Sequence, residues 1–329
     1  MATQITYSDN SINILTIKTY KGIGRAWIVK NLRDNEKVDA IVSLLNKDAK
    51  EDYQITVEKF ERNKARIIDN IEKLEGFVDG VVAIGDTDFP PYRGKVKNSE
   101  QPIFLFYRGD LSLLKTTSKN IAVIGLLNPD KDIEIMEQEV VAELVKNGAT
   151  IISGLALGCD TIAHRQALNS NGKTVAILPS PLNNILPATN KELANEIVNK
   201  NGLLITEYYE DTKSKMELGG RYQERDRLQA LFSDSIVLTA SYAKNDQGND
   251  SGSRLAMGYA LNYSIPRAVI YDPELNANNP KYDLSRQLIR EQRDITIINQ
   301  KNLSETVKKI ISNKPLMKNN QQIQSNLFN

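Results

Sequence analysis

Histidine and cysteine are almost absent from this sequence of 329 residues, which contains one of each, His164 and Cys159. A zinc site built from cysteine and histidine needs about four ligands, so one chain cannot form it. A single cysteine excludes an internal disulfide, which agrees with a reducing cytoplasm. A Ser-His-Asp triad would have to use His164, and the sequence has no G-x-S-x-G turn for the nucleophile. We therefore expect no metal, no cofactor and no catalytic residue.

Long apolar runs and an excess of charge of either sign are also missing. No apolar run approaches the length needed to span a bilayer, and the first ten residues lack the layout of a signal peptide. We therefore expect a cytoplasmic protein without a membrane partner. The 42 basic residues nearly balance the 41 acidic ones, so any binding of nucleic acid must come from a local patch and not from the overall field.

A regular alternation of apolar runs and helical patterns begins near residue 119. The apolar runs show no polar alternation, which indicates strands that are buried on both faces. Helical patterns such as IEIMEQEVVAELVKN lie between most of them. This order predicts an α/β fold, a Rossmann-like, doubly wound and mainly parallel sheet with helices on both sides. The predicted strands are 120–125, 149–154, 173–179, 202–208, 234–240, 266–272 and 295–299.

The N-terminal part of the chain lacks this alternation and indicates short helices followed by a long one. Its glycine turn at 22–24 fits either a phosphate-binding turn, as in helix-hairpin-helix modules, or a plain turn in a small helical domain. Residues 76–118 contain two extended segments around a Pro-Pro break, which we expect to extend the sheet or to join two domains. The predicted division is a helical domain over 1–75, a Rossmann-like domain over 76–313 and a disordered polar tail over 314–329.

The loop SGLALGCD, residues 153–160, follows a predicted strand and leads into a helix. Gly154 and Gly158 let the backbone turn tightly, and the free N–H groups at the helix start attract an anion. The loop therefore fits either a phosphate cradle or a tight turn without a ligand, since its spacing differs from the dinucleotide motif G-x-G-x-x-G. Asp160 and His164 are expected to cap or pack. We expect Gly158→Asp to abolish ligand binding without unfolding the protein.

The stretch SGLALGCDTIAHRQAL closely resembles the S-G-x-A-x-G-[IV]-D-x-x-A-H-x-x-A-L signature of the DNA-processing protein A family, DprA or Smf. RYQERDRLQALFSDSIVLTAS and DSGSRLAMGYALNYSIPRAVI are similar to later segments of that family, and the resemblance covers residues 76–272. It implies a Rossmann-like domain that binds single-stranded DNA, often as a homodimer. It also implies loading of a RecA-type recombinase during natural transformation, and the family often has an N-terminal helical module of sterile-alpha-motif type.

The resemblance implies a DNA site where the loops after the strands meet. Arg225 and Arg227 match the family's R-N-R segment and are expected at the start of a helix, but an aspartate lies between them. The family's Gly-Ser-Arg after the first strand is replaced by Gly125-Leu126-Leu127, which removes a cation. The expected DNA- or phosphate-binding residues are Gly125, Ser153, Gly154, Gly158, Lys173, Arg225, Arg227, Ser251, Gly252, Ser253 and Arg254. The expected structural or capping residues are Asp160, His164 and Glu207.

Two other functions stay open at the level of the sequence. The missing cation and the neutral charge balance favour a sensor of nucleotide-derived small molecules, for example in anti-phage defence. An enzyme acting on nucleotides would need Glu207 or Asp160 to activate water or a sugar, although acids at strand ends are more often structural. For DNA binding, Tyr222 and Tyr242 are candidates for base stacking.

Overall fold

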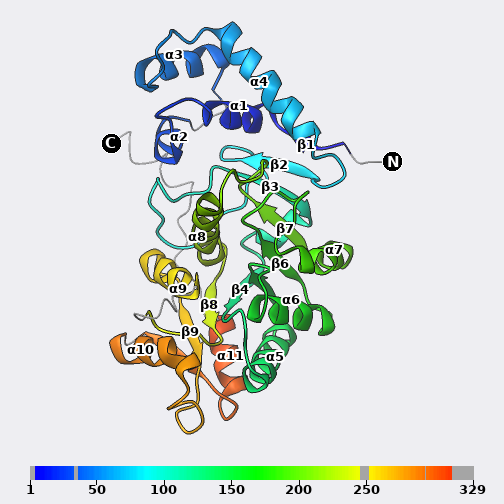
Figure 1. Cartoon of the computed structure of the whole chain (residues 1–329), viewed down its shortest axis with the longest axis vertical. Coiled ribbons are helices and arrows are strands. Elements are labelled where there is room, and N and C mark those ends of the chain that lie inside the picture. The colour runs from blue at the N-terminus through cyan, green and yellow to red at the C-terminus, as the bar shows by residue number, and fades with distance from the viewer. Residues whose placement is uncertain (1–3, 33–35, 245–251, 293, 313–329) are drawn as a thin grey trace.

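The centre of the molecule is a ten-stranded, mostly parallel sheet. The structure is a computed structural model that describes residues 4–32, 36–244, 252–292 and 294–312. Its strands are β1 (Thr6–Tyr7), β2 (Gly80–Ala83), β3 (Phe104–Gly109), β4 (Lys119–Ile124), β5 (Ala149–Ser153), β6 (Thr174–Ile177), β7 (Leu203–Thr206), β8 (Ser235–Leu238), β9 (Arg267–Ile270) and β10 (Ile295–Ile298). Their order in the sheet is β1-β2-β3-β7-β6-β5-β4-β8-β9-β10 (Figure 1). All neighbours from β7 to β10 are parallel, whereas β3 is antiparallel to both β2 and β7.

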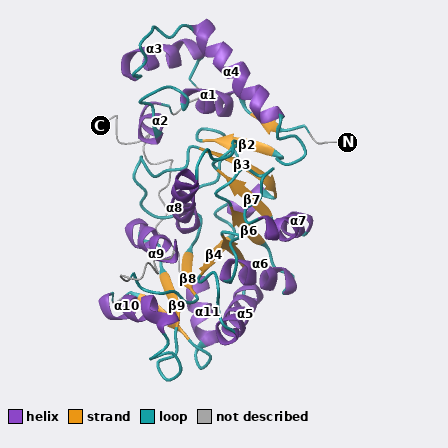
Figure 2. Ribbon diagram, in the orientation of Figure 1, coloured by secondary structure: helices purple, strands orange, loops and turns teal. Residues whose placement is uncertain are grey.

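Helices cover the sheet on both faces (Figure 2). They are α1 (Asp9–Ile17), α2 (Arg25–Asn31), α3 (Val38–Asp48), α4 (Val57–Glu72), α5 (Lys131–Lys146), α6 (Cys159–Asn169), α7 (Lys191–Asn199), α8 (Lys215–Leu231), α9 (Gly252–Tyr263), α10 (Asp283–Glu291) and α11 (Leu303–Ser312). Side chains of α5, α6 and α11 share one core cluster, and those of α8, α9 and α10 share another. None of the helices within the described ranges is long and apolar enough to cross a bilayer.

The predicted Rossmann-like fold is confirmed, and each of the seven predicted strands is present as one of β4 to β10. The reason is visible in β4, where successive side chains point to opposite faces of the sheet. Ile121 and Val123 pack with α5 and α6, whereas Ala122 and Ile124 pack with α8 and α9. Because both faces are covered, the four consecutive positions 121–124 of β4 are all apolar.

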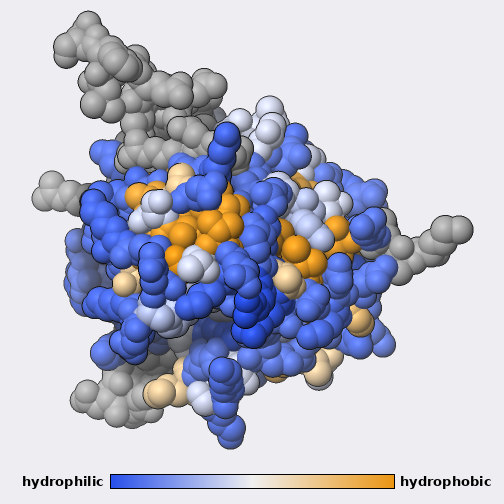
Figure 3. Space-filling model, turned by 90° about the horizontal axis from the view of Figure 1, so that it is seen from above, coloured by the Kyte–Doolittle hydropathy of each residue, from blue (hydrophilic) through white to orange (hydrophobic). Residues whose placement is uncertain are grey.

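The N-terminal helices form a layer above β2 and β3 (Figure 1). Their apolar side chains share one core with the sheet and with α7, as shown by Phe60 of α4, Phe106 of β3 and Ile197 of α7. As expected, the segment before β4 extends the sheet through β2 and β3, and β1 also pairs with β2. Seen from above, the outer side of this layer is mainly hydrophilic, with apolar patches between the polar side chains (Figure 3). The domain boundary at residue 75 stays a prediction, and the predicted tail, 314–329, lies outside the described residues.

The order of the strands reverses between β4 and β8. The chain passes outward from β4 through β5 and β6 to β7, and then returns to β8, β9 and β10 on the other side of β4. In open α/β sheets, ligands bind outside the carboxyl ends of the strands at such a reversal. The loops that follow β4, β5 and β8 are therefore the natural place for a binding site.

Candidate nucleic-acid interface

The loops after β4 and β5 meet the start of α9 at the carboxyl edge of the sheet, where the strand order reverses. Gly158 has a φ of 72°, and a Cβ added to it would lie 2.3 Å from the carbonyl oxygen of Leu126. The N–H of Cys159 donates to that same oxygen at 2.9 Å. At the start of α9, the hydroxyl of Ser253 donates to the carbonyl oxygen of Gly125 at 3.0 Å. Because Gly158 is enclosed in this way, Gly158→Asp is expected to strain the fold, contrary to the expectation from the sequence.

The carboxylate of Asp160 occupies the turn that the glycine-rich loop forms. Its Oδ2 accepts hydrogen bonds from the N–H groups of Gly154 and Ala156, both at 3.2 Å, and from Nη1 of Arg225 at 3.3 Å. When the amide oxygen of Gln229 is turned toward them, it accepts from Arg225 Nη1 at 3.2 Å and from the Gly154 N–H at 2.9 Å. A phosphate would have to displace this internal ion pair, so phosphate binding by Gly154 and Arg225 stays a prediction.

Asp226 is the third member of this buried cluster, and its Oδ1 lies 3.3 Å from Nε of Arg225. Burial raises the pKa of Asp226 to about 7. The positive charge of Arg225 lowers this pKa, but the negative charge of Asp160 partly cancels that attraction. The cluster therefore contains one guanidinium and two carboxyl groups. All three side chains are less than 10% exposed, so none of them is displayed on the surface.

Arg227 belongs to a second cluster, which is partly buried and joins the sheet to the helical layer. It contacts Glu207, at the end of β7, through Nη2 at 2.5 Å and Glu224 through Nε at 3.1 Å. Arg25 of α2 contacts the same two carboxylates at 3.1 Å and 2.7 Å. Burial disfavours the charge of Arg227, but the two carboxylates more than offset this effect and raise its pKa. The two positive and two negative charges are balanced.

The remaining predicted site residues lie at different places. Lys173 precedes β6 at the amino edge of the sheet, opposite to the loops above, and its Nζ donates to a backbone carbonyl at 3.0 Å. The hydroxyl of Ser153 is buried and donates to a backbone carbonyl of β4 at 2.7 Å. Gly252 and Arg254 flank Ser253 in the first turn of α9, at the carboxyl edge. Ser251 lies outside the described residues.

The sequence model of the family described as DNA recombination-mediator protein A matches residues 80–308. The chain belongs to this family. Protein Smf of Borreliella burgdorferi is 26% identical over 297 residues, which cover 89% of this chain and 87% of that protein. Matches to the other curated relatives cover only 37% to 56% of those proteins.

Two solved structures of DNA processing protein A resemble this DprA family member. The Streptococcus pneumoniae protein has the same fold, with a TM-score of 0.68 at 22% identity, over 92% of this chain and 98% of that one. The Helicobacter pylori protein, whose structure describes a single-stranded DNA binding mode, gives a TM-score of 0.53 at 26% identity. That match covers 69% of this chain and 99% of the H. pylori chain.

In this DprA family member, three further titratable groups behind the glycine loop are buried. Nδ1 of His164 lies 2.7 Å from the hydroxyl of Thr174, and burial together with the charge of Arg225 lowers the pKa of His164 to about 3. Burial also raises the pKa of the Cys159 thiol and of the Glu137 carboxyl beside it. The sequence patterns did not single out Glu137, although its spacing from Ile133 and Val140 places it in the apolar stripe of α5.

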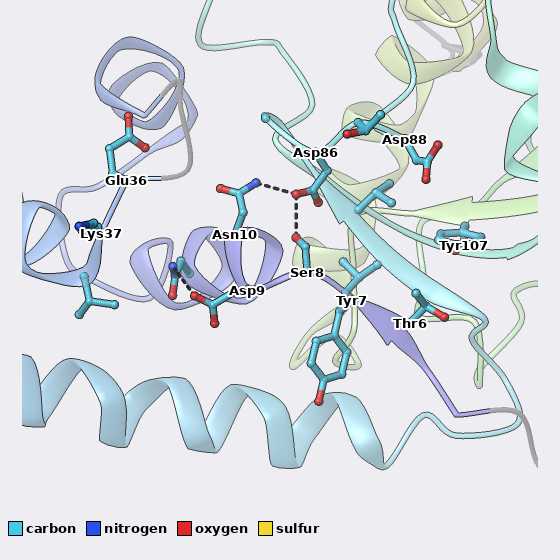
Figure 4. A pocket seen from close by; sticks show the side chains of 16 residues that line it. Thr6, Tyr7, Ser8, Asp9, Asn10, Glu36, Lys37, Asp86, Asp88 and Tyr107 are labelled. Atoms are coloured by element: carbon cyan, nitrogen blue, oxygen red, sulfur yellow. Dashed lines mark hydrogen bonds between the residues drawn. The ribbon is translucent and has the colours of Figure 1, made fainter.

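A separate pocket of about 660 Å³ lies between the helical layer and the outer edge of the sheet (Figure 4). Its lining includes the four carboxylates of Asp9, Glu36, Asp86 and Asp88. Asp86 accepts hydrogen bonds from the Ser8 hydroxyl at 2.7 Å and from the Asn10 amide at 2.9 Å. This acidic lining would repel a phosphate, so the pocket does not compete with the loop edge as a DNA site.

Within the part of the chain that the structure describes, no cluster of histidine, cysteine and acidic residues is placed to hold a metal ion.

Proposed function

We propose that this protein binds single-stranded DNA at the carboxyl edge of its sheet and acts in the cytoplasm as a mediator that loads a RecA-type recombinase. The observation that carries the proposal is that the loops after β4 and β5 meet the start of α9 at the reversal of strand order, in a chain that belongs to the DprA family. The single-stranded DNA binding mode described for the H. pylori relative supports it further. The function needs no catalytic group, since no bond is made or broken.

The proposed contacts fall into two groups. Arg254, in the first turn of α9, brings a cation to the loop edge, where a DNA backbone would contact it. The neighbouring hydroxyl of Ser253 is buried and donates to the carbonyl oxygen of Gly125, so it supports the loop from within. Arg225 and Arg227 act differently, because their buried ion pairs hold α8 against the loop and against β7. They are positioning residues in this proposal, and the strand itself contacts the loops. A second copy of the chain and the recombinase are the proposed protein partners.

Fluorescence polarisation with a labelled single strand tests the DNA-binding step. Arg254→Ala is expected to weaken binding and to lower the dependence of log Kd on log salt by about one unit, because one phosphate contact is lost. Lys173→Ala is the matched control, since it removes a cation from the opposite edge of the sheet. Wild-type protein that binds a nucleotide from a panel, and no single strand even at low salt, would contradict the proposal and favour a nucleotide sensor.

Recombinase loading is tested separately, on single strands coated with single-strand-binding protein. Addition of this protein should shorten the delay before a RecA-type recombinase forms filaments on those strands. Arg254→Ala should restore most of the delay, whereas Lys173→Ala should not. DNA binding without any effect on filament formation would contradict the mediator role and leave only the binding step.

A further inference from the structure

Two leucines at the reversal of strand order are unusually exposed. Leu127, in the loop after β4, is 60% exposed, and Leu157, in the loop before α6, is 47% exposed. Most large apolar side chains of the sheet domain are buried in the core clusters instead. Exposed apolar groups at a place where ligands bind are more informative than scattered ones.

The two leucines are carried by backbone segments that touch each other. A Cβ added to Gly158, the residue after Leu157, would lie 2.4 Å from the carbonyl oxygen of Leu127 and 2.5 Å from its carbonyl carbon. The hydrogen bond from the Cys159 N–H to Leu126 closes the same contact between the loops. The backbones that carry the two side chains are therefore held together, and we call this pair the leucine lip.

Polar groups next to the leucine lip are already engaged within the protein. Asp160 accepts from the N–H groups of Gly154 and Ala156, and the N–H of Cys159 is bound by Leu126. The charge of Arg225 faces Asp160 and Asp226. The lip thus offers apolar contact area. At position 127 it has a leucine where the family's Gly-Ser-Arg motif has an arginine.

We propose that the leucine lip contacts the bases of bound single-stranded DNA, an inference that rests on the DNA binding proposed above. A nucleobase presents apolar faces, whereas the phosphates carry the charge that requires cations. Contact with the lip removes apolar surface from water and releases no counterions, so it strengthens binding without adding to the salt dependence. The lip therefore replaces a phosphate contact by a base contact at this point of the strand.

The test compares an oligothymidylate with a strand of the same length whose central nucleotides are abasic. Leu127→Ala with Leu157→Ala should weaken binding of the normal strand about tenfold and leave its salt dependence unchanged. The abasic strand should bind the double variant and the wild type equally, because it keeps the phosphates and lacks the bases. Leu275→Ala is the control, since Leu275 is 79% exposed and lies after β9. Unfolding midpoints of all variants should match that of the wild type.

Three results would overturn the inference. Equal affinity of wild type and double variant for the normal strand would show that the lip does not contact DNA. An equal loss on both strands would show that the effect passes through phosphates or through the fold. A loss accompanied by a change of oligomeric state in sedimentation would make the lip an interface between copies. If the wild type binds no single strand at all, the proposed function itself fails, which is distinct from these results.

Discussion

Arg225 and Arg227 of α8 are two residues apart in the sequence, but they belong to two separate clusters of ion pairs with different partners. Arg225 is shared by two aspartates, Asp160 and Asp226, within the sheet domain. Arg227 is joined by Arg25 against two glutamates and links the sheet to the helical layer. Residues two apart on a helix point to nearly opposite sides, which separates the two guanidinium groups.

The difference shows how charge balance and exposure together set the pKa of a carboxyl group, since the side chain of Asp226 is 6% exposed and that of Glu224 is 41% exposed. With more carboxyl groups than cations, burial raises the pKa of Asp226 to about 7. In the balanced cluster, burial also opposes the charge of Glu224, but Arg25 and Arg227 outweigh it and lower the pKa of Glu224. An R-x-R segment is therefore not evidence of two equivalent phosphate ligands when it lies inside a helix.

Arg227→Met is expected to have the largest effect, because it leaves the 4% exposed carboxylate of Glu207 with Arg25 as its remaining partner in this cluster. Removal of one partner from a buried ion pair costs about 3–5 kcal/mol in the free energy of unfolding. Urea denaturation measures the loss. Arg62→Met, which removes an exposed pair with Glu58, is the control and should cost less than about 0.5 kcal/mol. A similar small loss in both variants would contradict the structural role of Arg227.

Gly154→Ala should disrupt the other cluster, with a loss of about 3 kcal/mol in the free energy of unfolding from overlap and broken pairing. The added Cβ would lie 1.0 Å from Nη1 of Arg225, so the guanidinium would have to leave Asp160. Gly258→Ala is the matched control, because nothing lies within 4 Å of its added Cβ. In the helix α9 that change should stabilise the protein by about 0.5–1 kcal/mol. Equal effects of the two substitutions would show that Arg225 does not need the space above Gly154.

The sheet could be predicted because most of its strands are visible in the sequence as short apolar runs. Residues 121–124 of β4, for example, are apolar without alternation, since both faces of the sheet are covered there. The partners of the arginines could not be predicted in this way. Arg225 meets Asp160 only through the fold, across 65 residues of sequence, and no local pattern records such a contact.

The start of α8 is where the expectation from the sequence was wrong. Arg225 and Arg227 were expected at the start of a helix, but α8 begins at Lys215, capped by the hydroxyl of Ser214. No proline interrupts residues 215–231, so the helix extends further toward the N-terminus than the motif suggested. The spacing of Glu137 from the apolar residues of α5 could have predicted that it is buried. A glutamate in an apolar stripe is, however, easily assigned to the surface.

Asp226→Asn should change how stability depends on pH. The pKa of about 7 in the folded protein lies above the ordinary 3.8 of an aspartate, so the folded state keeps a proton that the unfolded state has lost. Stability of the wild type therefore falls as the pH rises from about 4 to about 7, and the asparagine variant lacks this loss. The difference between the two proteins should change by about 3 kcal/mol across that window, measured by urea denaturation. A difference that does not vary with pH would mean that Asp226 stays ionised and that both clusters are ordinary ion pairs.

Arg25→Ala should have the smallest effect, and it decides what holds the helical layer on the sheet. Arg25 is 22% exposed, and without it Glu207 and Glu224 both keep Arg227 as a partner. The loss should be about 1 kcal/mol at low salt and less at high salt, because a partly exposed pair is screened. The apolar core that joins α1 and α4 to β3 stays intact, so thermal unfolding should keep a single transition. A loss as large as that of Arg227→Met, or a separate early transition, would mean that the helical layer is held by charge. In that case, the balanced cluster would be the main attachment between the two layers rather than a supplement to the shared core.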